Sequence, residues 1–260
     1  MKDQIMQLLH KIEEKENIRI LLAVESGSRA WGFASPDSDY DVRFIYVRPR
    51  EEYLKLENTR DVIELPIDEV LDVNGWDLNK TLRLLRGSNP TLLEWLYSPI
   101  VYMEREETEK LKDLAQEYFS PKKILHHYLR MAERNAQLYL GKDMVRVKKY
   151  FYVLRPQLAC RWILDQGTTP PVLFSELMEA ELPGKLRPDV ERLLELKSGS
   201  GERKEIERVA VIEDYLTSEM EQIKEAIQQM EEPTDAGWEG LNEYFLWELN
   251  QGVSDIRSCV

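Results

Sequence analysis

The stretch Ser38-Asp39-Tyr40-Asp41-Val42-Arg43 lies ten residues after the pair Gly27-Ser28, and together they decide the fold. Residues 39–47 have the alternating pattern of a strand, whose side chains point in turn to its two faces. Asp39 and Asp41 therefore share one face. Two carboxylates this close repel each other unless a cation lies between them. The pattern predicts a site that holds a magnesium-bound triphosphate.

A turn suited to phosphate lies just upstream of these acids. Residues 18–24 form a near-continuous apolar run, typical of a strand buried on both faces, which ends at Glu25. Backbone N–H groups at the turn that follows, with the Ser28 hydroxyl, can cradle phosphate oxygens, and Gly27 permits close approach of the backbone. The next residue, Arg29, either neutralises the triphosphate or pairs with Glu25.

Arg43 shares the strand face of Asp39 and Asp41. From this position it can orient a carboxylate through a two-pronged contact. A purely structural salt bridge agrees with the sequence equally well, so both interpretations stay open.

These residues resemble the nucleotidyltransferase superfamily of DNA polymerase β, whose pattern is Gly-Ser, a spacer, and then Asp-x-Asp in a strand. The longer segment of residues 25–47, ESGSRAWGFASPDSDYDVRFIYV, is similar to predicted bacterial nucleotidyltransferases that include the RNA-ligase-associated (RNA-repair) members. The resemblance continues through residues 72–80 and 89–96 and returns more loosely at 148–156. It covers residues 1–165 well and the remainder poorly.

The resemblance implies a two-metal magnesium site in which Asp39 and Asp41 are ligands and an NTP is the substrate. It also implies a third carboxylate from a neighbouring strand. Asp72, between two apolar residues, has the pattern of a strand that offers one acid to a site. Asp77 suits the first turn of a helix, where a carboxylate is favoured. The sequence favours Asp72 as the metal ligand and Asp77 as a cap or supporting partner.

The remaining pattern predicts two domains. Residues 1–120 form an α/β (α+β) nucleotidyltransferase domain with a small mixed sheet, and residues 121–260 form an all-α helical domain that binds substrate or nucleotide. Expected strands are 18–25, 39–47, 61–67, 70–73 and 100–103. Expected helices are 2–16, 50–57, 77–86, 90–97, 104–119, 121–140, 143–165, 172–181, 187–197, 203–230 and 237–249.

The charge distribution bears on possible partners. A net charge of −13 gives the chain no long-range attraction to nucleic acid. Residues 122–161, however, carry ten basic side chains against two acidic ones. This segment suits a clamp for triphosphate or RNA. The alternative is a solvated face that balances the acidic C-terminal helices.

Three residues of this segment share one helix face, because Lys148, Tyr152 and Arg155 are spaced i, i+4 and i+7. Two cations with an aromatic ring can grip phosphates and stack a base. Aromatic side chains in such a helix are also common core residues, so a structural role is the competing interpretation.

Several other classes of protein do not fit the sequence. Two cysteines are too few for a disulfide framework, and no apolar run is long enough to span a membrane. The first 17 residues read as a charged amphipathic helix and not as a signal peptide, which predicts a cytoplasmic protein.

The sequence therefore predicts a magnesium-dependent nucleotidyltransferase that moves an NMP from an NTP to an acceptor hydroxyl and releases pyrophosphate. The resemblance makes an RNA 3′ end, in RNA repair, the first acceptor to consider. Nucleotidylylation of a protein or small molecule is one alternative, and a non-catalytic nucleotide-binding or antitoxin-like module is another. No motif specifies the base preference, templating or the oligomeric state.

Overall fold

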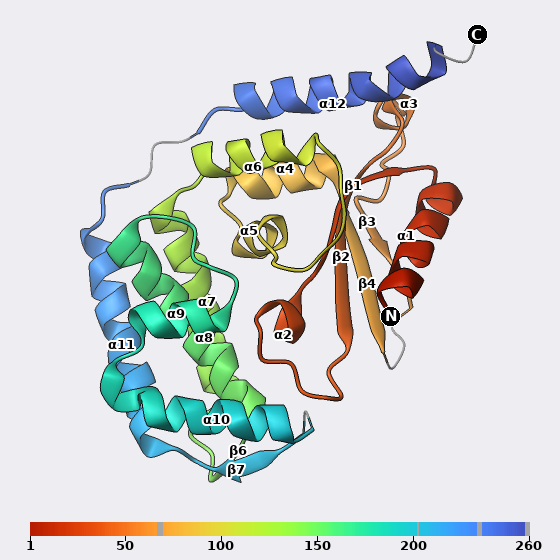
Figure 1. The fold of residues 1–260 in the computed structure, drawn as a ribbon. Coiled ribbons are helices and arrows are strands. Elements are labelled where there is room, and N and C mark those ends of the chain that lie inside the picture. The colour runs from red at the N-terminus through yellow and green to blue at the C-terminus, as the bar shows by residue number, and fades with distance from the viewer. Residues whose placement is uncertain (67–69, 202, 233–235, 258–260) are drawn as a thin grey trace. The chain divides into compact units, whose positions relative to one another are not determined.

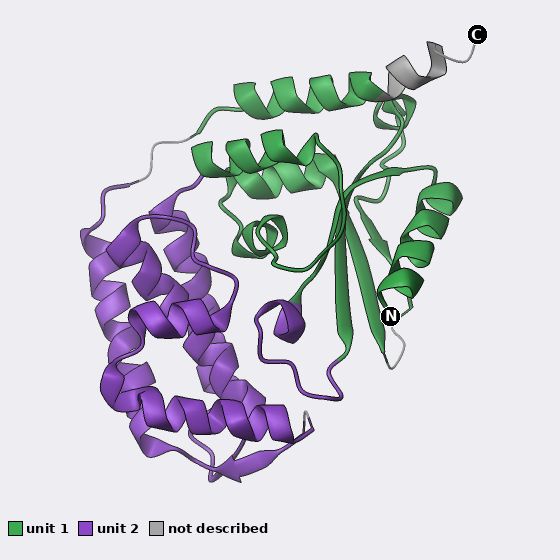
Figure 2. Ribbon diagram, in the orientation of Figure 1, with its two compact units in different colours: residues 1–26, 39–118, 235–260 green, residues 27–38, 119–234 purple. Residues whose placement is uncertain are grey.

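The computed structural model describes residues 1–66, 70–201, 203–232 and 236–257, and of residues 252–257 it describes only the backbone. The chain forms two compact units, which Figure 2 colours separately. The first comprises residues 1–26, 39–118 and 235–260, and the second comprises residues 27–38 and 119–234. The sequence predicted a single cut between residues 120 and 121. In the structure, residues 27–38 belong to the second unit and residues 235–260 belong to the first.

The first unit is built on a five-stranded mixed sheet with the order β3-β4-β2-β1-β5 (Figure 1). Strands β2 and β4 are parallel, and the other neighbouring pairs are antiparallel. The strands are β1 (Arg19–Glu25), β2 (Tyr40–Val47), β3 (Val62–Glu64), β4 (Leu71–Asp77) and β5 (Val101–Glu104). The helices are α1 (Lys2–Glu16), α3 (Arg50–Tyr53), α4 (Leu78–Arg86), α5 (Pro90–Leu96), α6 (Thr108–Glu117) and α12 (Glu239–Arg257).

Strand β2 divides its side chains between the core and the site, as its alternation predicted. Val42 and Phe44 are fully buried in a cluster that includes Ile5 and Leu9 of α1. Arg43 lies on the opposite face and is only partly buried. Strand β1, which lies between β2 and β5, is buried along almost its whole length, which explains its continuous apolar run.

Strand β4 is longer than the sequence indicated, since it runs to Asp77 and not to residue 73. Its whole length pairs in parallel with β2, from Tyr40↔Leu71 to Tyr46↔Asp77. Gly75, which resembles a turn residue in sequence, is needed within the strand for space. A Cβ atom there would lie 2.1 Å from the ring of Phe44. Tertiary packing, not turn chemistry, explains this glycine.

Gly75→Ala is therefore expected to destabilise the protein by about 1–3 kcal/mol, the usual range for overpacking a filled core. The measurement is urea unfolding followed by far-UV circular dichroism. Gly87→Ala is the matched control, because a Cβ at Gly87 would meet its nearest atom at an ordinary 3.4 Å. Equal unfolding midpoints for the two variants would contradict the packing argument.

The second unit is mostly helical, as predicted. Its helices are α2 (Gly27–Ala30), α7 (Pro121–Tyr139), α8 (Val147–Gln166), α9 (Phe174–Glu181), the 3-10 helix η1 (Gly184–Leu186), α10 (Arg187–Gly199) and α11 (Ala210–Gln229). It also contains a two-stranded antiparallel sheet of β6 (Met144–Arg146) and β7 (Glu205–Glu207). The sequence assigned both strands to the first turns of helices. Their pairing joins segments about sixty residues apart, which a local pattern does not reveal.

Several smaller boundaries also differ from expectation. Helix α6 begins at Thr108 and not at residue 104, and α12 runs to Arg257 and not to residue 249. Strand β3 spans three residues within the predicted range 61–67, whose last residue lies outside the described part of the chain. Helix α3 ends at Tyr53 and not at residue 57. The α/β first part and the helical second part agree with the predicted fold class. None of the described helices combines the length and apolarity needed to cross a membrane.

Candidate active site

The parallel pairing of β2 with β4 brings two of the predicted acids together. Asp41 and Asp72 are directly opposed partners in this register. The side chain of Asp41 is 22% exposed and that of Asp72 is 29% exposed, so both carboxylates can reach a ligand from solvent. Asp39 directly precedes β2 and is exposed.

Arg43 joins these two carboxylates. Its Nη2 donates to Asp41 Oδ1 at 2.9 Å and to Asp72 Oδ2 at 2.7 Å. Its Nη1 also donates to the backbone oxygen of Asp72 at 2.8 Å. The sequence left open whether Arg43 orients a carboxylate or forms a structural ion pair. The contacts show one guanidinium that holds both acids in place.

The carboxylate pair can be tested for its fit to magnesium. Across the described residues, no group of three or more His, Cys, Asp and Glu side chains is gathered closely enough to hold a metal ion. Asp41 and Asp72, however, are hard oxygen donors that already share a cationic group within 3 Å of each. Magnesium is commonly bound by one or two carboxylates together with phosphate oxygens and water. The pair therefore fits the metal that the resemblance implies.

Asp77, the other candidate for the third carboxylate, caps helix α4, as the sequence favoured. Its Oδ1 accepts from the backbone N of Asn79 at 2.8 Å, and the hydroxyl of Tyr53 donates to its Oδ2 at 3.0 Å. Only 3% of Asp77 is exposed. It is five residues along β4 from Asp72, a distance of about 16 Å in an extended strand. Burial raises the pKa of the Asp77 carboxyl above its ordinary value.

Asp77→Ala is expected to cost about 2 kcal/mol of folding stability, because the helix loses its cap and the partly buried Tyr53 hydroxyl loses its acceptor. Asp77→Asn retains a capping oxygen and should lose less. Since the folded-state pKa is raised, folding favours the protonated Asp77. Wild-type stability relative to Asp77→Asn should be greatest below the ordinary carboxyl pKa of 3.8 and decline as pH rises through the raised value. Thermal unfolding from pH 3 to 8 measures this, and a constant difference would contradict it.

The predicted phosphate turn belongs to the second unit. Gly27 begins α2 with φ +59°, a conformation that favours glycine. The Ser28 hydroxyl donates to Ser38 Oγ at 3.2 Å, and Arg29 Nη2 donates to the backbone oxygen of Ser38 at 2.6 Å. Arg29 therefore ties the two ends of the 27–38 segment together, a contact that neither interpretation from the sequence included.

Trp31 and Phe33, which the sequence did not mark as functional, connect this segment to the helices of the second unit. The rings of Trp31 and Tyr152 meet edge to face at 6.3 Å, and the rings of Phe33 and Phe151 lie 4.9 Å apart. In the sequence, the indication of this packing was the pair of aromatic residues three and five positions after Ser28. They make the turn part of the helical core of this unit.

The predicted face of α8 therefore meets the 27–38 segment. The Arg155 guanidinium lies 4.7 Å from the centre of the Trp31 ring and donates to the backbone oxygen of Val172 at 3.2 Å. Arg155 is only 3% exposed. Its contacts position Trp31. They favour a structural role for Arg155 over a direct grip on phosphate. Lys148, one turn before Tyr152, is partly exposed.

Several side chains of the basic segment are paired with acids. Lys122 donates to Glu232 at 2.6 Å, and Arg161 lies 3.4 Å from Glu219 of α11. These contacts agree, for these residues, with a basic face that balances the acidic C-terminal helices.

Known proteins resemble this chain over most of its length. Residues 1–247 match the family described as "RNA repair pathway DNA polymerase beta family" (RlaP). The chain is 51% identical over 233 residues to "Uncharacterized protein YcgL" of Bacillus subtilis (strain 168), covering 88% of this chain and 89% of that protein. A crystal structure of a nucleotidyltransferase-like protein from Exiguobacterium sibiricum 255-15 aligns over 86% of this chain and 74% of that one, with 15% identity and a TM-score of 0.32.

Proposed function

Because the chain belongs to the RNA repair pathway DNA polymerase beta family, we propose that it is a magnesium-dependent nucleotidyltransferase whose acceptor is the 3′ end of an RNA. The observation that carries this proposal is the side-by-side placement of Asp41 and Asp72 on two parallel strands. Their carboxylates share one cationic partner and remain accessible to solvent.

The proposed reaction transfers an NMP. The acceptor hydroxyl oxygen forms a bond to the α-phosphorus of the NTP, and the bond from that phosphorus to the bridging oxygen breaks. Pyrophosphate leaves with this oxygen, and the hydroxyl proton passes to a carboxylate oxygen of the site. Magnesium, when held by Asp41 and Asp72, would supply positive charge that offsets the negative charge of the reacting phosphate.

The predicted metal ligands and the predicted phosphate-binding residues both have roles in this proposal. Asp41 and Asp72 would hold the metal, Asp39 would be a third ligand that the bound ion draws in, and Arg43 would keep the carboxylates of Asp41 and Asp72 aligned. Gly27 and Ser28 would contact phosphate through backbone N–H groups and a hydroxyl, while Arg29 would act by fixing the turn. Two further residues of the predicted set, Tyr152 and Arg155, would act indirectly through Trp31.

The test is incubation of the protein with each α-³²P-labelled NTP, Mg²⁺, and either total cellular RNA or lysate protein. Asp39→Ala/Asp41→Ala protein serves as the inactive control. We expect label on RNA with wild-type protein alone. Label on protein or on a small molecule would instead support nucleotidylylation of those acceptors. No label, with NTP still bound, would favour a binding module.

An RNA acceptor leads to a prediction about Lys148. Lys148→Glu should weaken RNA binding several-fold and make the affinity less dependent on salt, because one phosphate contact is lost. Lys185→Glu is the control, since Lys185 is an exposed lysine outside the predicted helix face. Fluorescence anisotropy of labelled RNA at increasing NaCl measures both effects. Equal salt slopes for the two variants would remove Lys148 from the RNA contact.

A further inference from the structure

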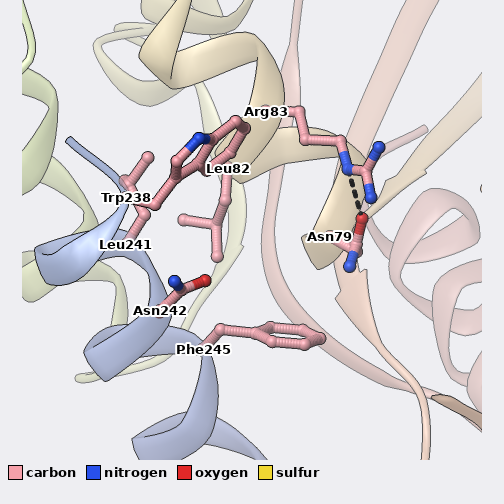
Figure 3. Close-up of a pocket in the computed structure, with 7 residues that line it drawn as sticks. All are labelled: Asn79, Leu82, Arg83, Trp238, Leu241, Asn242 and Phe245. Carbon is pink, nitrogen blue, oxygen red and sulfur yellow. Dashed lines mark hydrogen bonds between the residues drawn. The ribbon is translucent and has the colours of Figure 1, made fainter. Parts of the chain in front are cut away.

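A groove between α4 and α12 lies within the first unit and takes no part in the proposed reaction. Its cavity volume is about 340 Å³, near the lower end of the usual range for small-molecule sites. Figure 3 shows the side chains that line it, which come from both helices and from Trp238, the residue directly before α12. Asp77 separates this groove from Asp72 along β4, so it is distinct from the carboxylate pair.

Each helix lines the groove with one face. Asn79, Leu82 and Arg83 of α4 occupy positions i, i+3 and i+4, which share one helix face. Leu241, Asn242 and Phe245 lie close together on α12, and Trp238 lies directly before the first residue of that helix.

The floor of the groove is apolar and its rim is polar. Leu82 and Leu241 are 5% and 1% exposed, and they form the floor. Asn79 and Asn242 place a carboxamide on either helix. Arg83 Nε donates to Asn79 Oδ1 at 2.8 Å, which orients one of these amides.

Trp238 supplies an aromatic surface at the rim. Its side chain is 43% exposed, and the Arg86 guanidinium lies 4.4 Å from the ring centre. Arg86 also donates to the backbone oxygen of Ala236 at 2.9 Å, and this hydrogen bond holds the guanidinium against the Trp238 ring. At the other end, the ring of Phe245 meets Tyr53 edge to face at 5.1 Å. Both aromatic rings are thus held by neighbours.

These groups suit a planar heterocycle with hydrogen-bonding edges. A carboxamide offers a donor and an acceptor together, which matches the edge of a nucleobase, whereas a carboxylate offers acceptors only. An exposed tryptophan is a platform on which any base can stack. Among the residues that the structure describes, no carboxylate lines the groove.

The charge beside the groove is also favourable for a nucleotide. Helix α4 carries Lys80, Arg83 and Arg86 and no acidic residue. On α12, Glu243 follows Asn242 by one position and is turned about 100° from it around the helix. Glu239 lies one turn before Asn242 and does not line the groove.

We propose that the α4–α12 groove binds a nucleobase, stacked on Trp238 and hydrogen-bonded by Asn79 and Asn242. The base can belong to a free nucleoside or to a single-stranded RNA, whose phosphates would meet the cations of α4. This site is additional to the proposed transfer reaction and requires none of its carboxylates.

The test uses the full chain in EDTA, so that metal-bound triphosphate makes no contribution. Isothermal titration with the four ribonucleosides and anisotropy with short 5′-fluorescein-labelled RNA distinguish the two sources of the base. Trp238→Ala should weaken binding roughly ten- to a hundredfold, and Asn242→Asp roughly tenfold. Leu246→Ala is the control, because Leu246 is an exposed residue of α12 that does not line the groove.

Binding of nucleosides that is lost in Trp238→Ala supports a free base as ligand, and binding of RNA alone that is lost in the same variant supports a base within a strand. The proposal is overturned if the wild-type protein binds neither probe, or if Trp238→Ala binds as Leu246→Ala does. Repeating the titration with Asp41→Asn separates the sites, because loss of the carboxylate should leave the groove's affinity unchanged. A parallel loss in Asp41→Asn would place the base at the transfer site and overturn the proposal.

Discussion

Asp41→Asn is expected to lower the rate of nucleotidyl transfer by at least about 10²–10³-fold while the protein stays folded. The substitution removes a negative charge and one hard oxygen donor but preserves the shape of the side chain. Asp41 is partly exposed, and its core-facing neighbours Val42 and Phe44 are unchanged, so the sheet keeps its packing. The measurement is incorporation of α-³²P-labelled NMP, with circular dichroism to verify the fold.

Asp72→Asn should show a similar loss of turnover with a smaller effect on NTP binding. Asp3→Asn is the matched control, because Asp3 is an exposed aspartate of α1 in the same unit. Full activity in Asp41→Asn would refute the metal assignment. A loss of turnover in Asp77→Asn, with Asp72→Asn active, would transfer the third-carboxylate role to Asp77.

Arg43→Gln is expected to separate metal affinity from turnover. The guanidinium lies within 3 Å of an oxygen of Asp41 and of Asp72, so it repels any second cation that approaches the pair. Removing it should raise the affinity for Mn²⁺ roughly tenfold, as judged from the Coulomb energy of partly exposed charges. Turnover should nevertheless fall, because the two carboxylates lose the group that aligns them.

The measurement is electron paramagnetic resonance of free Mn²⁺ without nucleotide, which reports metal affinity independently of catalysis. Arg43→Lys retains the positive charge and should keep the wild-type affinity. Arg60→Gln is a second control, because Arg60 is 67% exposed and pairs with Glu64 instead. If Arg43→Gln binds Mn²⁺ no more tightly than wild type, Arg43 does not compete with the metal.

The local chemistry of the proposed site was readable from the sequence. Alternation along residues 39–47 separates Asp41 and Arg43 from Val42 and Phe44, since a strand repeats every two residues. The cap role of Asp77 was likewise predicted, because a carboxylate before a helix accepts from the first-turn N–H groups. Such features depend on neighbours only a few residues away, and a single sequence records them.

Contacts between distant segments were decided by tertiary structure. Asp41 and Asp72 are neighbours only because β2 and β4 pair in parallel in one register, and a shift of one residue would turn Asp72 to the other face. The segment 27–38 packs into the helical unit through Trp31, which turns Arg155 from an apparent phosphate ligand into a buried support. The sequence was enough to identify the residues whose side chains suit metal and phosphate, because that depends on side-chain chemistry and local periodicity. Which of these residues meet followed from the fold, because strand register and side-chain packing depend on residues far apart in the chain.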